Sequence, residues 1–106
     1  MFDLHWSPSE KKIARDIYER VLATAEAKLV AELKTKASAA ASFSDMWGVE
    51  DWLREERKYM AGIFDYRYSR LPLFFSWAIR AGHMDERALS GLSEDKLKVI
   101  RRIARD

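Results

Sequence analysis

The feature that most constrains this sequence is the stretch of residues 8–41, in which no glycine or proline follows Pro8. Apolar residues recur along it at three- and four-residue spacing, which is typical of one face of a helix. They are Ile13, Ile17, Val21, Leu22, Ala25, Leu29 and Leu33. Ser7, followed by Pro8 and then by Glu10, has the pattern of a helix N-cap with a capping box. The sequence therefore predicts one long helix over residues 8–41.

The length of this helix bears on assembly. About 33 helical residues extend roughly 50 Å, whereas a compact globule of this chain length is about 35 Å across. The chain has 106 residues, enough for a single domain. The overhanging part of the helix would expose Leu29 and Leu33 unless another chain covered them. Two-fold homodimers are the commonest soluble assemblies, so we expect a homodimer. The alternative is a sharp bend that folds the first helix back on itself.

The rest of the chain also predicts helices, because alternating strand patterns are nearly absent. Ser44 can cap a second long helix that runs to about residue 68. A third helix is expected over residues 71–80, with Pro72 in its first turn and Gly82 at its C-terminal stop. A short helical turn over residues 83–89 and a last helix capped by Ser93 follow. The last helix should turn Leu97, Ile100 and Ile103 inward.

These elements predict an all-α fold within a single domain, residues 1–106. A long N-terminal helix packs with the second long helix to form a stalk, about residues 8–68. A small helical head, about residues 71–106, follows the stalk. We expect the complete assembly to be a dimer of such helical subunits.

Composition and charge exclude several classes of protein. Without cysteine, the chain has no disulfides, thiolate nucleophiles or cysteine-ligated zinc. Residues 1–6 do not resemble a signal peptide, and the apolar run of residues 71–79 is too short for a bilayer span, so we expect a soluble, cytoplasmic protein without membrane insertion. The 19 basic and 17 acidic side chains are interleaved, which argues against nucleic acid as a partner. Cations gather only in residues 96–102, where the dipole of the last helix favours them.

The residues also offer little catalytic chemistry. His5 and His83 are far apart and lack a neighbouring ligand at metal-binding spacing. The carboxylates of the second helix lie near cations, and ion-paired acids are poor general acids. No glycine-rich phosphate loop or serine–histidine arrangement is present. We therefore expect no catalytic residue, no metal and no cofactor.

One face of the second helix has an unusual composition. Val49, Trp52, Leu53, Met60 and Ile63 form an ordinary core stripe on one side. The opposite side, an arc of about 120° at 100° per residue, carries Trp47, Glu50, Asp51, Arg54 and Arg57. Trp and Arg are enriched at binding hot spots, so we interpret this face as an interface, either with a second copy or with another protein. The alternative is that Glu50 and Arg54 form an ordinary exposed pair while Trp47 packs on a neighbouring helix.

Two other segments combine aromatic residues with a possible surface role. Residues 73–79 carry apolar side chains on too many sides for a surface helix. They form either central core or core plus a docking patch of the head, with Phe74, Phe75 and Trp77 as candidates. Tyr66, Arg67 and Arg70, together with the basic last helix, offer the alternative of weak nucleic-acid binding.

Residues 46–57, Met-Trp-Gly-Val-Glu-Asp-Trp-Leu-Arg-Glu-Glu-Arg, followed by Phe-Asp-Tyr-Arg at residues 64–67, resemble the fluorescence recovery protein family. The resemblance implies an all-helical homodimer that binds the photoactivated orange carotenoid protein. Such a protein speeds the return of its partner to the resting orange form and ends quenching at the phycobilisome. Trp47, Asp51 and Arg57 match family residues held to be important for the dimer interface and for activity.

Glu50 departs from the family pattern, in which histidine is frequent at this position. The alternative is therefore a helical protein-interaction module of the same fold with a different partner.

Overall fold

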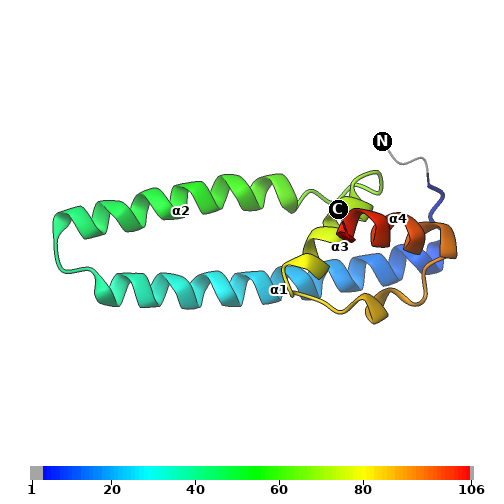
Figure 1. Cartoon of the computed structure of the whole chain (residues 1–106), viewed down its shortest axis with the longest axis horizontal. Helices are drawn as coiled ribbons and strands as arrows, with labels where there is room; N and C mark the ends of the chain where they lie inside the picture. Colours follow the sequence, from blue (N-terminus) through cyan, green and yellow to red (C-terminus); the bar gives the residue numbers. More distant parts are fainter. Residues whose placement is uncertain (1–3, 106) are drawn as a thin grey trace.

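The computed structural model describes residues 4–105, and every regular element within them is helical (Figure 1). The elements are α1 (Pro8–Ala39), α2 (Phe43–Ile63), α3 (Leu71–Arg80), the short 3₁₀ helix η1 (Glu86–Leu89) and α4 (Glu94–Arg105). The predicted all-α fold, with two long helices followed by a small helical head, is confirmed. Residues 1–3, on which part of the signal-peptide prediction depends, lie outside the described residues.

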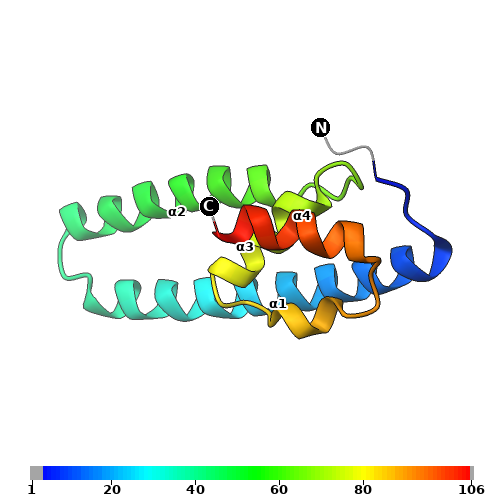
Figure 2. The same cartoon turned by 45° about the vertical axis from the view of Figure 1, so that its right-hand side comes forward.

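The two long helices run antiparallel as a hairpin, and the smaller helices gather at one end of it (Figures 1 and 2). α1 remains one continuous helix over 32 residues, so the alternative of a sharp bend is wrong. Its predicted capping box is confirmed. The Glu10 backbone N–H donates to Ser7 Oγ at 3.2 Å, and the Ser7 N–H donates to Glu10 Oε1 at 3.0 Å.

The turn between the two long helices begins earlier than predicted. Ser42, and not Ser44, is the N-cap of α2, since its Oγ accepts a hydrogen bond from the Asp45 N–H at 3.0 Å. The Asp45 carboxylate in turn accepts from the Ala41 N–H at 2.9 Å. An acid at the third helical position satisfies a backbone donor next to the cap, and this reciprocal pair fixes the start of the helix.

α2 also ends earlier than predicted, at Ile63 instead of near Tyr68. Beyond this point the aromatic side chains leave the helical path and pack on Tyr18 of α1. The ring centroid of Phe64 lies 5.7 Å from that of Tyr18, and the centroid of Tyr66 lies at 4.8 Å. Burial of these rings in the head outweighs the propensity of the segment to continue the helix.

The hydrophobic core lies in the head and includes the first half of α1. Its buried side chains come from residues 6–25, from α3 and from residues 89–100, among them Ile17, Val21, Leu71, Phe74, Phe75, Leu89, Leu92, Leu97 and Ile100. The Ser76 hydroxyl joins α3 to α4 by donating to the carbonyl oxygen of Ile100 at 3.0 Å. Ile103, predicted to face inward with Leu97 and Ile100, is half-buried.

The burial of α3 corrects part of the docking-patch hypothesis. Phe74 is 4% exposed and Phe75 is fully buried, so both side chains belong to the core and are not accessible to a partner. Trp77 is half-buried, and the docking hypothesis therefore applies to this residue alone.

The half of the hairpin remote from the head has no core of its own. We call residues 26–63 the distal hairpin; all of them are described, and none is buried. The expectation of an ordinary core stripe on α2 is therefore wrong, since its apolar residues are only partly covered by α1. The Cα radius of gyration is 16.6 Å, against about 13 Å for a compact chain of this length. The chain forms a rod of 53 × 24 × 23 Å.

Candidate protein-interaction surface

The five residues singled out on α2 share one exposed side of the helix, which we call the interaction face: Trp47, Glu50, Asp51, Arg54 and Arg57. Arg54 lies between the two acids, with its guanidinium nitrogens 3.2 Å from Glu50 and 3.9 Å from Asp51. These exposed pairs of one helix contribute little to stability, of the order of a few tenths of a kcal/mol each. They do orient three charged side chains next to Trp47.

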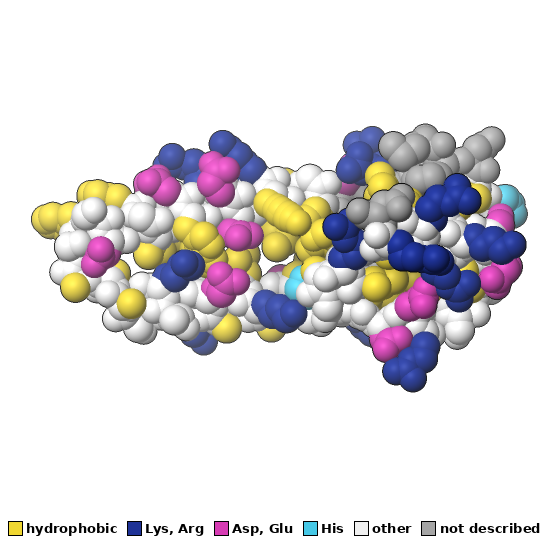
Figure 3. Space-filling model, in the orientation of Figure 1, with side chains coloured by type: hydrophobic (Ala, Val, Ile, Leu, Met, Phe, Trp, Pro, Cys, Tyr) yellow, Lys and Arg dark blue, Asp and Glu magenta, His cyan; other side chains and the backbone are white. Residues whose placement is uncertain are grey.

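Trp47 itself is 55% exposed, so it does not pack fully against the neighbouring helix. Its indole stacks on Phe43, with ring centroids 6.3 Å apart and planes inclined by 13°. Phe43 is 75% exposed. In Figure 3 hydrophobic surface extends to the tip of the hairpin, the end remote from the head. Two stacked aromatic rings in water are an unusual termination for a helical hairpin and are typical of a binding surface.

Beside Trp47 the surface is hollowed. A groove of about 360 Å³ lies between the end of α1 and the first turns of α2. Its lining is mostly apolar: Ala37, Ala40, Met46, Trp47, Val49, Glu50 and Leu53. Ala37 and Ala40 make room because their side chains are short, while Met46 remains 50% exposed. Phe43, Met46 and this groove were not predicted from the sequence, because Ser44 was expected to cap the helix and Phe43 would then have preceded it.

Arg57 lies further along α2 and differs from Arg54. Among the described residues, no carboxylate lies within ion-pair distance of its guanidinium, although the side chain is exposed. Ten residues of helix separate it from Trp47, which corresponds to roughly 15 Å. The interaction face is thus an elongated strip with an aromatic end and a basic end.

The half-buried Trp77 connects the head to the stalk. Its indole N–H donates to the hydroxyl of Tyr59 on α2 at 2.9 Å. The two rings border a cleft of about 510 Å³, together with Leu73, Ser76, Arg80, Ala81 and Ile103. His83 packs against Trp77 with ring centroids 5.0 Å apart, and burial lowers the pKa of this histidine.

The residues considered for nucleic-acid binding do not form a free basic aromatic cluster. The Tyr66 hydroxyl is buried, and this burial raises the pKa of Tyr66 to about 12. Arg67 and Arg70 both contact the Asp65 carboxylate, at 3.0 and 3.9 Å. Neither the ring nor the two guanidinium groups are therefore arranged to stack on bases.

The described residues offer neither a metal site nor a membrane span. Over residues 4–105 no group of three potential metal ligands comes together. None of the helices in that range has the length and apolarity needed to cross a membrane.

Comparisons with known proteins agree with one another. A family profile described as "Photoprotection regulator fluorescence recovery protein" matches residues 6–104. The chain is 26% identical over 100 residues to the fluorescence recovery protein of Synechocystis sp., covering 94% of this chain and 92% of that protein. The solved structure of the Fremyella diplosiphon fluorescence recovery protein superposes with a TM-score of 0.91 at 26% identity, and that from Synechocystis with 0.91 at 25%. Each alignment covers 96% of this chain and all of the solved one.

Proposed function

Because this chain belongs to the fluorescence recovery protein family of photoprotection regulators, we propose that it is a non-enzymatic homodimer that binds the photoactivated orange carotenoid protein. It accelerates the return of this partner from the red to the resting orange form and thereby ends quenching at the phycobilisome. The interaction face and the stacked rings of Phe43 and Trp47 supply the contact surfaces.

The observation that carries the proposal is the absence of any buried residue in the distal hairpin, all of which the structure describes. Val30, Leu53 and Tyr59 join the exposed aromatic tip along this part of the molecule. Apolar surface of this extent favours association, since covering it removes it from water. A second copy of the same hairpin has the length required to cover it.

The proposed acceleration requires no catalytic side chain. A protein speeds a conformational change when it binds the barrier state more tightly than the starting state, whereas equal binding of both changes no rate. A hundredfold acceleration needs only about 2.7 kcal/mol of such preference. One or two well-packed aromatic or arginine contacts supply an energy of that size.

Two measurements on the same variants test the proposal. Light scattering gives the mass of the wild type, and the dark return of photoactivated orange carotenoid protein is timed by its colour. We expect a wild-type mass of about twice 12.4 kDa and an accelerated return. We expect Trp47→Ala or Arg57→Ala to weaken the dimer, the acceleration or both, because each removes a hot-spot side chain.

Lys12→Ala is the matched control, since Lys12 is exposed on α1 away from the distal hairpin. Unchanged mass with a slower return in both variants would assign the face to partner binding instead of self-association. If the wild type leaves the return rate unchanged, the orange carotenoid protein is not its partner.

The second candidate is a helical interaction module of the same fold with a different protein partner. Glu50 favours it, because an acid paired with Arg54 stands where the family resemblance leads us to expect histidine. Glu50→His separates the two candidates. If only the variant accelerates the colour return, position 50 selects the partner. If neither protein does, while the wild type is dimeric, the different-partner candidate is favoured.

A further inference from the structure

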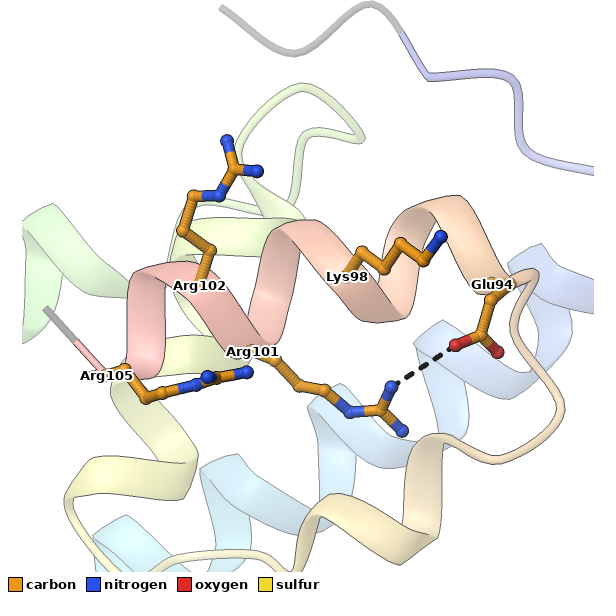
Figure 4. Close-up of a pocket in the computed structure, with 5 residues that line it drawn as sticks. All are labelled: Glu94, Lys98, Arg101, Arg102 and Arg105. Carbon is orange, nitrogen blue, oxygen red and sulfur yellow. Dashed lines mark hydrogen bonds and ion pairs between the residues drawn. The ribbon is translucent and has the colours of Figure 1, made fainter.

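We propose that the outer face of α4 is a second interaction surface, one that binds an acidic segment of a protein partner. Four cations form this face, which we call the basic face: Lys98, Arg101, Arg102 and Arg105. Their spacing places them within an arc of about 100° on the helix. The centre of this arc lies roughly 150° around the helix from the buried side chain of Ile100. The surface between them forms a shallow depression of about 420 Å³ (Figure 4).

Among residues 4–105, Arg101 is the one cation of this face that pairs with a carboxylate. Arg101 contacts Glu86 at 2.8 Å and Glu94 at 3.3 Å. Within residues 4–105, the other three cations of the face have no carboxylate at ion-pair distance. By contrast, the exposed Arg15 and Arg20 of α1 are paired one helical turn away, with Glu19 at 3.2 Å and Asp16 at 2.8 Å. Figure 3 shows basic side chains gathered over the head.

The stability of α4 does not account for this arrangement. Cations in the last turn interact favourably with the helix dipole, which explains Arg102 and Arg105. Lys98 lies in the first half of the helix, where that effect is absent. Like charges one turn apart, such as Lys98 and Arg102, destabilise a helix by a few tenths of a kcal/mol. Lys98, Arg102 and Arg105 are also exposed, so they contribute little to the core.

The shape and chemistry of the face favour an acidic peptide over nucleic acid. Lys98 and Arg105 are separated by about 10 Å along the helix. Acidic side chains on one side of an extended peptide recur about every 7 Å, so two or three carboxylates can meet these cations together. Single-stranded nucleic acid is held by aromatic side chains on which bases stack. The lining consists of Glu94 and the four cations, and it contains no such ring.

The test uses the full chain and a fluorescein-labelled ten-residue peptide of alternating glutamate and serine, followed by fluorescence anisotropy. The variant Lys98→Gln/Arg102→Gln/Arg105→Gln removes three charges from the face. We expect about tenfold weaker binding, because each exposed charge pair contributes a few tenths to 1 kcal/mol. The control Lys11→Gln/Lys12→Gln/Arg20→Gln makes the same change in net charge at exposed positions of α1 outside the distal hairpin. It should alter the affinity less than twofold.

Three results would overturn the proposal: no binding by the wild type at low salt, equal loss of affinity in the two triple variants, or tighter binding of a ten-residue oligothymidine that depends on the same face. The second result would show that only net charge matters. The third would reassign the face to nucleic acid. Circular dichroism of each variant establishes that the helices are intact, so that a loss of affinity is not a loss of fold.

Discussion

At the scale of single residues, one buried ion pair ties the beginning of the chain to its end. Glu10 and Lys96 are 7% and 2% exposed, and their charged atoms lie 3.2 Å apart. The Glu10 carboxylate also accepts hydrogen bonds from the backbone N–H groups of Ser7 and Ser93, at 3.0 and 2.8 Å. The Lys96 ammonium lies 5.2 Å from the ring centroid of Trp6. The carboxylate and the ammonium group of this pair thus each have more than one partner.

We expect Glu10→Gln to lower the free energy of unfolding by about 3 kcal/mol, because it leaves the Lys96 charge buried without its partner. Urea unfolding followed by circular dichroism measures this change. The double variant Glu10→Gln/Lys96→Met should recover part of the loss, since it removes the isolated charge as well. A double variant less stable than Glu10→Gln would contradict this account.

The same carboxylate gives the fold a defined response to acid. Burial raises the pKa of Glu10, but the Ser7 and Ser93 N–H groups and Lys96 more than offset it and lower the value from 4.5 to about 2. The folded-state pKa lies below the unfolded one, so this stabilisation is complete above pH 4.5 and is lost as the pH falls towards 2. Unfolding between pH 6 and 2.5 should show less acid sensitivity in Glu10→Gln than in the wild type. Equal acid sensitivity of the variant and the wild type would mean that groups other than Glu10 cause the acid response.

The candidate site was only partly predictable at this scale. The spacing of the interaction face on one side of a helix follows from helix geometry, so Trp47 and its charged neighbours could be identified. Phe43 and the groove beside Trp47 could not, because their exposure depends on where the hairpin turns. Phe74 and Phe75 carry the same apolar character as Trp77. Only packing against α1 and α4 distinguishes core from surface among them.

At the scale of the elements, helix existence was more predictable than helix ends. Capping residues and a long apolar period determine that α1 forms and where it starts. The end of α2 depends instead on tertiary contacts, since Phe64 and Tyr66 leave the helix to reach Tyr18. Likewise two serines were available as caps for α2, and the reciprocal bond with Asp45 selected Ser42.

Substitution by alanine is expected to have opposite effects on stability at two glycines of the chain. Gly48 lies inside α2, and a Cβ at this position would meet no atom within 4 Å, so Gly48→Ala should raise stability by about 0.5–1 kcal/mol. Gly82 ends α3 with φ at 76°, and Gly82→Ala should lower stability by about 1 kcal/mol because alanine is strained there. Urea unfolding at one protein concentration measures both. A Gly48→Ala variant that is less stable would mean that another chain covers this position in the assembly.

At the scale of the whole molecule, the core and the exposed apolar surface lie at opposite ends of the rod. The head holds the buried residues, whereas the distal hairpin presents apolar surface that residues 4–105 leave uncovered. The molecule thus combines a folded head with a projecting hairpin whose surface favours association. The overhang was predictable from the length of α1 alone. The amount of exposed apolar surface could not be predicted, because α2 was expected to bury its apolar stripe.

If the proposed dimer covers the distal hairpin, thermal stability must depend on protein concentration. Association stabilises the folded state by mass action, so a tenfold increase in concentration adds about 1.4 kcal/mol per dimer and should raise Tm by roughly 3 °C. Scanning calorimetry over two decades of concentration measures the slope. Trp47→Ala should lower Tm most at low concentration, where its dimer dissociates first. A wild-type Tm independent of concentration, together with a mass near 12.4 kDa, would show that the exposed hairpin is stable in water by itself and is kept for another protein.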